Sequence, residues 1–150
     1  MVKQKLLISS CLFGELVRYD GNHNKISDID FKRLQEKYDL LSFCPEVEGG
    51  LSTPREACEI VSTTPLQIIT KSKIDQTKEF EEGALKALNI CKQQNIITAL
   101  LKSNSPSCSS KFIYDGTFSS VKVKGVGVTT QLLKENNIAV FDEYEIEKLL

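Results

Sequence analysis

Several features that would place a chain of this size in a specialised class are missing from this sequence. Its 19 Lys and Arg residues are balanced by 20 Asp and Glu residues, and no segment concentrates the basic ones. A polymeric nucleic acid or an anionic membrane surface is therefore not the expected partner. The apolar run 6–8 near the N-terminus is too short for a signal-peptide core or a membrane span. We therefore expect a cytoplasmic protein with no membrane partner.

The sequence also has no internal repeat, no low-complexity tract and no shift in composition that would mark a linker. Its 150 residues are 41% hydrophobic and 26% charged, which is the balance of an ordinary globular domain. We expect one domain, residues 1–150, with a core of its own. Nothing in the sequence indicates an oligomeric state.

The five cysteines include no CxxC pair, so no local metal-binding knuckle is present. Five thiols cannot all pair within a monomer, and a chain without an export signal is not expected to carry a disulfide framework. Metal binding, catalysis or simple burial remain open for each cysteine.

The pattern of apolar residues predicts an α/β fold. Short apolar stretches bounded by turn residues predict buried strands at 5–10, 40–47, 66–70, 96–102 and 138–141. Helical periodicity predicts a helix after a cap at Ser27 or Asp30, a longer one through 80–91 after Asp75 or Thr77, and others over 128–134 and 143–150. Strands that alternate with helices predict a single-domain, mostly parallel sheet with helices on both faces, a Rossmann-like three-layer arrangement.

Three of the cysteines follow predicted strands. Cys11 follows the first strand, Cys44 lies near the end of the second, and Cys108 comes soon after the strand that ends near 102. The loops after parallel strands share one sheet edge, where open α/β sheets usually bind ligands, so these three thiols can meet there. Cys91 continues the apolar stripe of a predicted helix and is interpreted as core. Cys58 has no partner at short spacing and is also interpreted as structural; a role as a metal ligand is the less favoured alternative.

Several segments, taken in order, resemble one known family. They are Cys11-Leu12-Phe13-Gly14, Val17-Arg18-Tyr19-Asp20-Gly21, Cys44-Pro45-Glu46-Val47, Thr53-Pro54-Arg55, Asn104-Ser105-Pro106-Ser107-Cys108, Ile113-Tyr114-Asp115-Gly116-Thr117-Phe118 and Gly125-Val126-Gly127-Val128-Thr129. In this order they are similar to the DUF523 or TudS-like (2-thiouracil desulfurase-like) family. The resemblance covers nearly the whole chain.

The resemblance implies an enzyme that holds an oxygen-labile [4Fe-4S] cluster on Cys11, Cys44 and Cys108. One iron would then lack a protein ligand and would be free to take the sulfur of a thiolated substrate. The implied reaction is non-redox: sulfur leaves a thiolated nucleobase or related small compound as hydrosulfide, and water replaces it. By the same resemblance Glu46 is the acid/base, and Ser105 assists proton movement or binds substrate.

Arg18 and Ser107 are the candidate substrate-binding residues, although Arg18 fits a simple ion pair with Asp20 equally well. The sequence departs from the family at Ser109, where Gly is usual after the third cysteine. If that position needed a positive φ, serine would cost on the order of 1 kcal/mol. A second departure is Glu56-Ala57-Cys58, where relatives tend toward proline.

Two other functions remain open from the residues alone. A cysteine phosphatase or arsenate reductase also begins with a strand, a cysteine and a downstream arginine, but its loop needs five residues between them. Here Val17 occupies the required place and Arg18 follows one position later. A structural zinc protein would use Cys11, Cys44, Cys108 and the only histidine, His23, which have suitable ligand types without supporting spacing.

Overall fold

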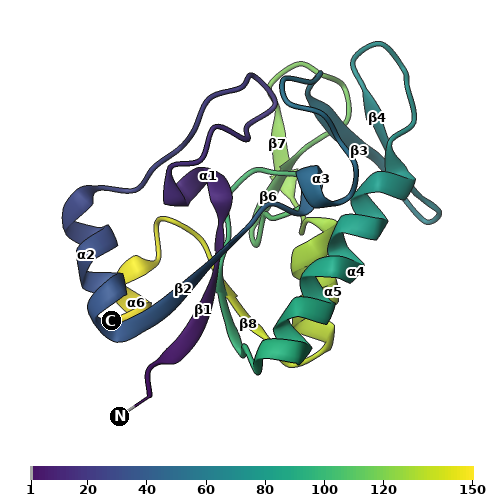
Figure 1. The fold of residues 1–150 in the computed structure, drawn as a ribbon. Helices are drawn as coiled ribbons and strands as arrows, with labels where there is room; N and C mark the ends of the chain where they lie inside the picture. The colour runs from purple at the N-terminus through teal and green to yellow at the C-terminus, as the bar shows by residue number, and fades with distance from the viewer. Residues whose placement is uncertain (1) are drawn as a thin grey trace.

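A four-stranded parallel sheet forms the centre of the molecule. The computed structural model describes residues 2–150, and Figure 1 shows its fold. The sheet consists of β1 (Gln4–Ser9), β2 (Tyr38–Phe43), β5 (Thr98–Leu100) and β8 (Ala139–Phe141), in the order β2-β1-β5-β8. All three pairings are parallel. The predicted α/β fold is therefore confirmed, and β1 lies between the two strands whose following loops carry Cys44 and Cys108.

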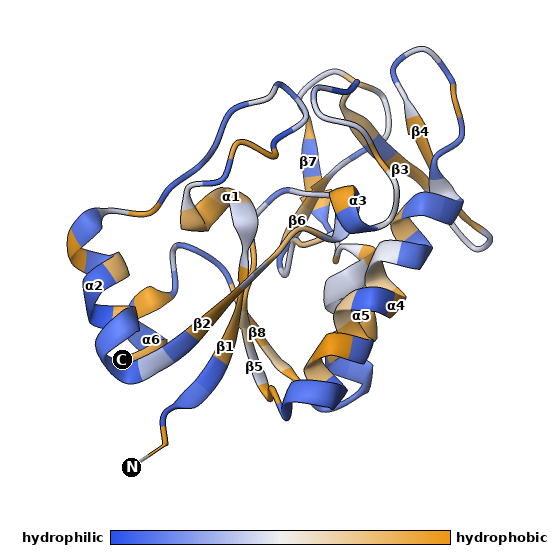
Figure 2. Cartoon of the chain, viewed as in Figure 1, coloured by the Kyte–Doolittle hydropathy of each residue, from blue (hydrophilic) through white to orange (hydrophobic). Residues whose placement is uncertain are grey.

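Each face of the sheet packs against its own set of helices. Side chains alternate along β1, so Leu7 points to one face while Leu6 and Ile8 point to the other. On the Leu7 side the core includes residues of α4 (Thr77–Gln94) and α5 (Val128–Glu135). On the other side it includes residues of α1 (Ser10–Phe13), α2 (Asp28–Lys37) and α6 (Ile146–Leu149). In Figure 2 the strands of the sheet are largely orange, with α2 and α6 on one side of them and α4 and α5 on the other.

The helices begin close to the positions predicted from their caps. Ser27 caps α2, because its side chain accepts a hydrogen bond from the backbone N–H of Asp30. Helix α4 begins at Thr77, whose backbone N–H donates to Asp75 Oδ1 at 2.8 Å. Cys91 lies on the inner face of α4 with 1% exposure, so its interpretation as a core residue is confirmed.

Two small antiparallel hairpins were not predicted. One pairs β3 (Cys58–Thr63) with β4 (Leu66–Thr70), and the other pairs β6 (Phe112–Tyr114) with β7 (Lys122–Lys124). The strand predicted at 66–70 is confirmed as β4, but it pairs antiparallel with β3 and does not join the parallel sheet. Only two residues separate β3 from β4, whereas a parallel connection needs a dozen or more. Leu66 and Ile68 instead pack in a separate apolar cluster with Ile60 and Phe80.

No helix within residues 2–150 is both long and apolar enough to cross a bilayer.

Candidate active site

Three neighbouring strands each deliver one cysteine to the same edge of the sheet. Cys11 lies in α1, directly after β1, and Cys44 caps the short helix α3 (Pro45–Glu48) directly after β2. Cys108 lies in the loop after β5. Because β2, β1 and β5 are adjacent and parallel, their carboxyl ends bring the three loops together.

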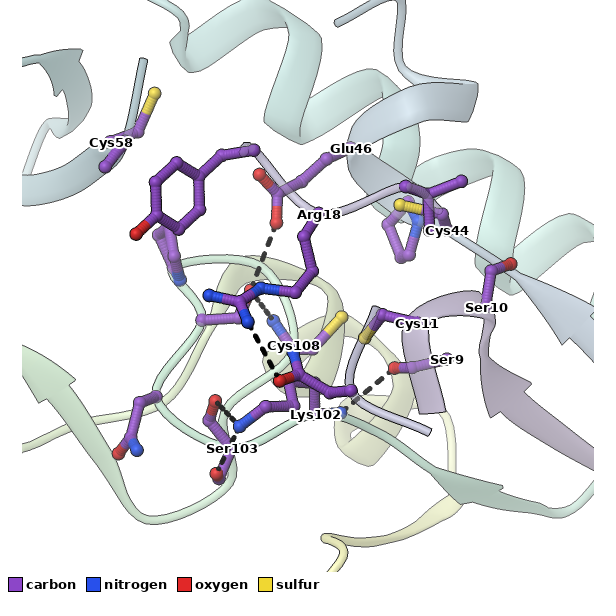
Figure 3. A pocket seen from close by; sticks show the side chains of 18 of the residues that line it. Ser9, Ser10, Cys11, Arg18, Cys44, Glu46, Cys58, Lys102, Ser103 and Cys108 are labelled. Atoms are coloured by element: carbon purple, nitrogen blue, oxygen red, sulfur yellow. Dashed lines mark hydrogen bonds between the residues drawn. The ribbon is translucent and has the colours of Figure 1, made fainter. Parts of the chain in front are cut away.

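The three cysteines line one cavity of about 320 Å³. Figure 3 shows the sulfurs of Cys11, Cys44 and Cys108 on the same side of this cavity. Cys58 also lines the cavity but lies apart from them, at the start of β3. Cys91 is not among the lining residues. The structure thus separates a group of three thiols from the remaining two.

Burial keeps these thiols in their neutral form when no metal is bound. It raises the pKa of Cys11 to about 11, and it also raises the pKa of Cys44 and of Cys108 above the ordinary value. A thiol with a raised pKa is a poor free nucleophile. A bound metal would displace the proton from such a thiol, so the raised pKa values argue only against a free cysteine nucleophile.

Glu46 lines the cavity, and its carboxyl group contacts Arg55 and Ser105. Its side chain is 19% exposed and forms an ion pair with Arg55, with 3.3 Å between Arg55 Nη2 and Glu46 Oε1. Its second oxygen, Oε2, accepts a hydrogen bond from Ser105 Oγ at 3.3 Å. Burial raises the pKa of Glu46, and the guanidinium of Arg55 is the largest opposing effect. A buried carboxyl group with a raised pKa is a candidate for proton transfer.

Arg55 is held by the segment that precedes it. Its Nη1 donates to the Ser52 carbonyl at 3.0 Å and to Thr53 Oγ1 at 3.2 Å, and its side chain is only 8% exposed. Its backbone N–H donates to the Tyr19 carbonyl. Arg55 therefore joins the loop that follows α1 to the carboxyl group of Glu46.

The Cys108 loop is anchored on the N-terminus of α5. Thr129 Oγ1 and Ser107 Oγ lie 2.7 Å apart, and Thr130 Oγ1 donates to the Cys108 carbonyl at 2.6 Å. All of these residues are buried. A Cβ atom at Gly127 would overlap the backbone of Ser107 and Cys108, so only glycine allows this close approach.

The sequence-predicted site residues do not all reach the cavity. The predicted residues that line the cavity are Cys11, Cys44, Cys108, Glu46, Ser105 and Arg18. Ser107 does not, because its fully buried hydroxyl is paired with Thr129 behind the wall of the cavity. His23 is exposed and is not a lining residue either.

The departure at Ser109 carries no backbone penalty. Ser109 is fully buried and its backbone lies outside the left-handed region, so the position does not require glycine. The second departure lies at the cavity itself, because Ala57 and Cys58 both line it.

Two residues of the site were missed by sequence reasoning. Arg55 belongs to the motif Thr53-Pro54-Arg55, and this motif could have identified it as a site residue. Asn24 lines the cavity and accepts a hydrogen bond from Arg18 Nη1 through Oδ1 at 3.1 Å. No pattern in the sequence marks Asn24, because an asparagine in a polar loop is common.

Comparison with known proteins agrees with this geometry. The family model described as 2-thiouracil desulfurase matches residues 6–145. The chain is 42% identical to the uncharacterized protein YbbK of Bacillus subtilis (strain 168), over 97% of this chain and 99% of that protein. The fold of this chain matches a solved structure described as the [4Fe-4S]-dependent thiouracil desulfidase TudS (DUF523Vcz). The TM-score is 0.92 and the sequence identity is 44%, over 98% of this chain and 95% of the other.

Proposed function

The chain belongs to the 2-thiouracil desulfurase family, and from this premise we propose that it is a [4Fe-4S]-dependent desulfurase acting on thiouracil or a related thiolated nucleobase. The substrate loses its sulfur as hydrosulfide, and water supplies the oxygen that replaces it. The observation that carries the proposal is the meeting of Cys11, Cys44 and Cys108 in one cavity at the ends of three adjacent parallel strands.

The donor set fits a cluster better than a single metal ion. Thiolates are the ligands that iron-sulfur clusters use. Within residues 2–150 no three Cys, His, Asp or Glu side chains are grouped closely enough to hold one ion. Ligands of a multi-iron cluster each bind a different iron, so they stand further apart than ligands of one ion. Cys11, Cys44 and Cys108 would therefore hold three irons.

Within the described residues, no fourth cysteine lies with Cys11, Cys44 and Cys108, so a cluster held by these three would keep one iron without a protein thiol. Cys58 lies apart on the cavity wall and Cys91 is in the core. When bound, such a cluster supplies a thiophilic Lewis-acidic iron for the substrate sulfur. The protein must then provide the groups that move protons.

Glu46 fills that role. It lines the cavity, and its two oxygens are fixed by Arg55 and Ser105. As a base it takes a proton from the water that attacks the carbon bearing sulfur, so that a C–O bond forms as the C–S bond breaks. The same proton passes to the departing sulfur, which leaves as hydrosulfide, and the second proton of the water is released from the new carbonyl oxygen to solvent. The balance is thiocarbonyl plus water giving carbonyl, hydrosulfide and one proton, with no net change of oxidation state.

Ser105 fixes the direction in which Glu46 points. Its oxygen accepts the backbone N–H groups of Ser107 at 3.0 Å and of Cys108 at 3.1 Å. Both lone pairs of the hydroxyl are thereby used, and its single proton is directed to Glu46. Ser107 supports the same loop from behind, so we assign it no contact with substrate. Arg18 remains a candidate for substrate contact at the cavity wall.

The two other functions have less support. A cysteine phosphatase needs a thiol with a lowered pKa, whereas burial raises that of Cys11 to about 11. A zinc site on the three cysteines and His23 would need His23 at the cavity, but it is an exposed loop residue outside the lining.

Anaerobic reconstitution tests the proposal. The reconstituted protein should contain iron and sulfide and release hydrosulfide from 2-thiouracil, and Glu46→Gln should keep the metal while losing most of the release. Binding of zinc without iron, or phosphatase activity in the metal-free protein, would contradict it.

A further inference from the structure

The proposed reaction gives no role to Asn104, although this residue lines the cavity of the three cysteines. Asn104 also borders a second hollow, which shares Ser103 and Asn104 with the cavity and contains no cysteine. The cavity therefore continues past Asn104 on a side where no thiol lies. A substrate held by its sulfur near the cysteines would present another edge of its ring to this side.

The backbone around Asn104 is fixed on both sides. The N–H of Ser103 donates to Glu143 Oε1 at 2.8 Å, and its hydroxyl donates to Glu143 Oε2 at 3.1 Å. Glu143 is held in turn by Lys102, whose Nζ lies 2.7 Å from Glu143 Oε2. On the other side, Ser105 is anchored by the three hydrogen bonds of its hydroxyl. Between these anchors Asn104 has a φ of 63°, which asparagine and glycine adopt more readily than other residues.

The side chain of Asn104 is available to a ligand. No hydrogen bond within residues 2–150 engages its amide, and neither amide atom is among the buried polar atoms that lack a partner. The NH₂ group and the carbonyl oxygen are therefore both unpaired and accessible at the cavity wall. A carboxamide of this kind, on a fixed backbone, can form two hydrogen bonds with one ligand.

This amide is complementary to a ring edge that carries an N–H beside a carbonyl group. Its NH₂ donates to the carbonyl oxygen while its own oxygen accepts the N–H, and asparagine and glutamine read base edges by two-point pairing of this kind. 2-Thiouracil has such an edge, formed by N3–H and the C4 carbonyl. Its sulfur lies on C2, outside this pair of groups, so the sulfur and the edge can be bound at the same time.

We propose that Asn104 is a substrate-binding residue whose amide pairs with the N–H and carbonyl edge of the thiolated base. The enzyme therefore selects thiolated lactams, which are rings with an N–H beside a carbonyl group, over thiocarbonyl compounds that lack this edge. Two-point pairing of this type is worth roughly tenfold to a hundredfold in discrimination. The inference rests on the proposed function, because it requires a thiolated base as the substrate.

Steady-state hydrosulfide release from 2-thiouracil and from 3-methyl-2-thiouracil tests this inference in the reconstituted protein. The methyl group replaces the N3 proton, so the wild type should prefer 2-thiouracil by roughly tenfold or more in kcat/KM. Asn104→Gly tolerates the positive φ and removes the amide, so most of the preference should disappear at unchanged iron content. Asn95→Gly is the matched control, because Asn95 also has a positive φ but ends α4 outside the cavity lining. It should keep the wild-type preference.

Asn104→Asp separates recognition from loop geometry. Aspartate has the size of asparagine and tolerates the same φ, but it lacks the NH₂ donor. If Asn104 acts through its amide, the KM for 2-thiouracil should rise in Asn104→Asp as it does in Asn104→Gly. A wild-type KM in Asn104→Asp would overturn the pairing and leave Asn104 a residue that only shapes the loop.

Uracil gives a readout that does not depend on sulfur binding to iron. It has the same N–H and carbonyl edge and no sulfur, so it should inhibit the wild type competitively. Its inhibition constant should rise by roughly tenfold or more in Asn104→Gly and stay unchanged in Asn95→Gly. Equal inhibition of the wild type and Asn104→Gly would contradict the inference.

The outcomes also separate this inference from the proposed function. A loaded wild-type protein that releases no hydrosulfide from any thiolated base would overturn the proposed function and this inference with it. Normal release by the wild type, with the same preference for 2-thiouracil in Asn104→Gly, would overturn the inference alone.

Discussion

Ser105 Oγ donates a hydrogen bond to Glu46 Oε2 at 3.3 Å, across 59 positions of sequence. The same oxygen accepts the backbone N–H groups of Ser107 and Cys108. One hydroxyl thus joins the carboxyl group proposed for proton transfer to the loop that carries the third cysteine. In the proposed mechanism, Ser105 therefore couples proton transfer to the loop that carries Cys108.

Replacement of Ser105 should therefore affect both activities. Ser105→Ala leaves two N–H groups of the loop without their acceptor, which we expect to cost about 1 kcal/mol of stability. It also frees Glu46 Oε2. Turnover should fall and the cluster should be lost faster in air, while Ser105→Thr should recover most of both. The decay of cluster absorbance and the rate of hydrosulfide release measure the two effects. A Ser105→Ala protein with wild-type cluster lifetime would show that the two N–H contacts are dispensable.

Glu46→Gln should separate chemistry from metal binding. The amide keeps the shape of the side chain but cannot take or give the proton, so turnover should fall by roughly a hundredfold or more. Iron content should stay normal, because Glu46 is not a proposed ligand. Glu48→Gln is the matched control, since Glu48 lies exposed on the same helix and its replacement should leave turnover unchanged. Loss of the cluster in Glu46→Gln would make Glu46 structural or a ligand.

The five cysteines should fall into two groups when each is changed to alanine. Loss of Cys11, Cys44 or Cys108 should abolish stable cluster binding. Cys91→Ala should retain the cluster and cost about 1 kcal/mol of folding stability, comparable to one buried methylene. Cys58→Ala should also retain it. Iron and sulfide quantitation together with thermal unfolding distinguish the groups, and a cluster that survives in all three cavity variants would refute the ligand assignment.

Gly83→Ala tests the close approach of α4 to α3. Helix propensity alone predicts that alanine inside α4 stabilises the protein by about 1 kcal/mol. A Cβ atom at Gly83, however, would overlap the Pro45 carbonyl, between Cys44 and Glu46. We therefore expect a lower melting temperature and less bound iron. Glu82→Ala, at the exposed neighbouring position, should show neither effect. A higher melting temperature in Gly83→Ala would mean that α3 shifts at no cost.

The sheet and the meeting of the cysteines were predictable because they follow from local patterns. The apolar runs that became β1 and β5 are short, buried and followed by polar loops, and parallel strands bring such loops to one edge. Ser27 marked the start of α2 as a standard capping residue. The roles of the cysteines came from the family resemblance and not from their spacing.

The details of the site were less accessible to sequence reasoning because they depend on contacts between distant segments. The strand at 66–70 was predicted, but its antiparallel pairing with β3 was not, because the apolar residues of a hairpin strand resemble those of a parallel sheet strand. Ser107 was predicted to bind substrate, but the partner of its hydroxyl is Thr129, 22 positions later. The orientation of Asn24 depends on a guanidinium six positions earlier, and periodicity carries no information about it.

The most direct test of the account is the release of hydrosulfide from 2-thiouracil by the anaerobically reconstituted protein, measured together with its iron and sulfide content. We expect about four irons and four sulfides per chain, in line with the [4Fe-4S] cluster named for the matching structure, and release that disappears when Cys11, Cys44 or Cys108 is changed to alanine. A fully loaded protein that releases no hydrosulfide from any thiolated nucleobase, or release that persists in a variant without metal, would contradict the account.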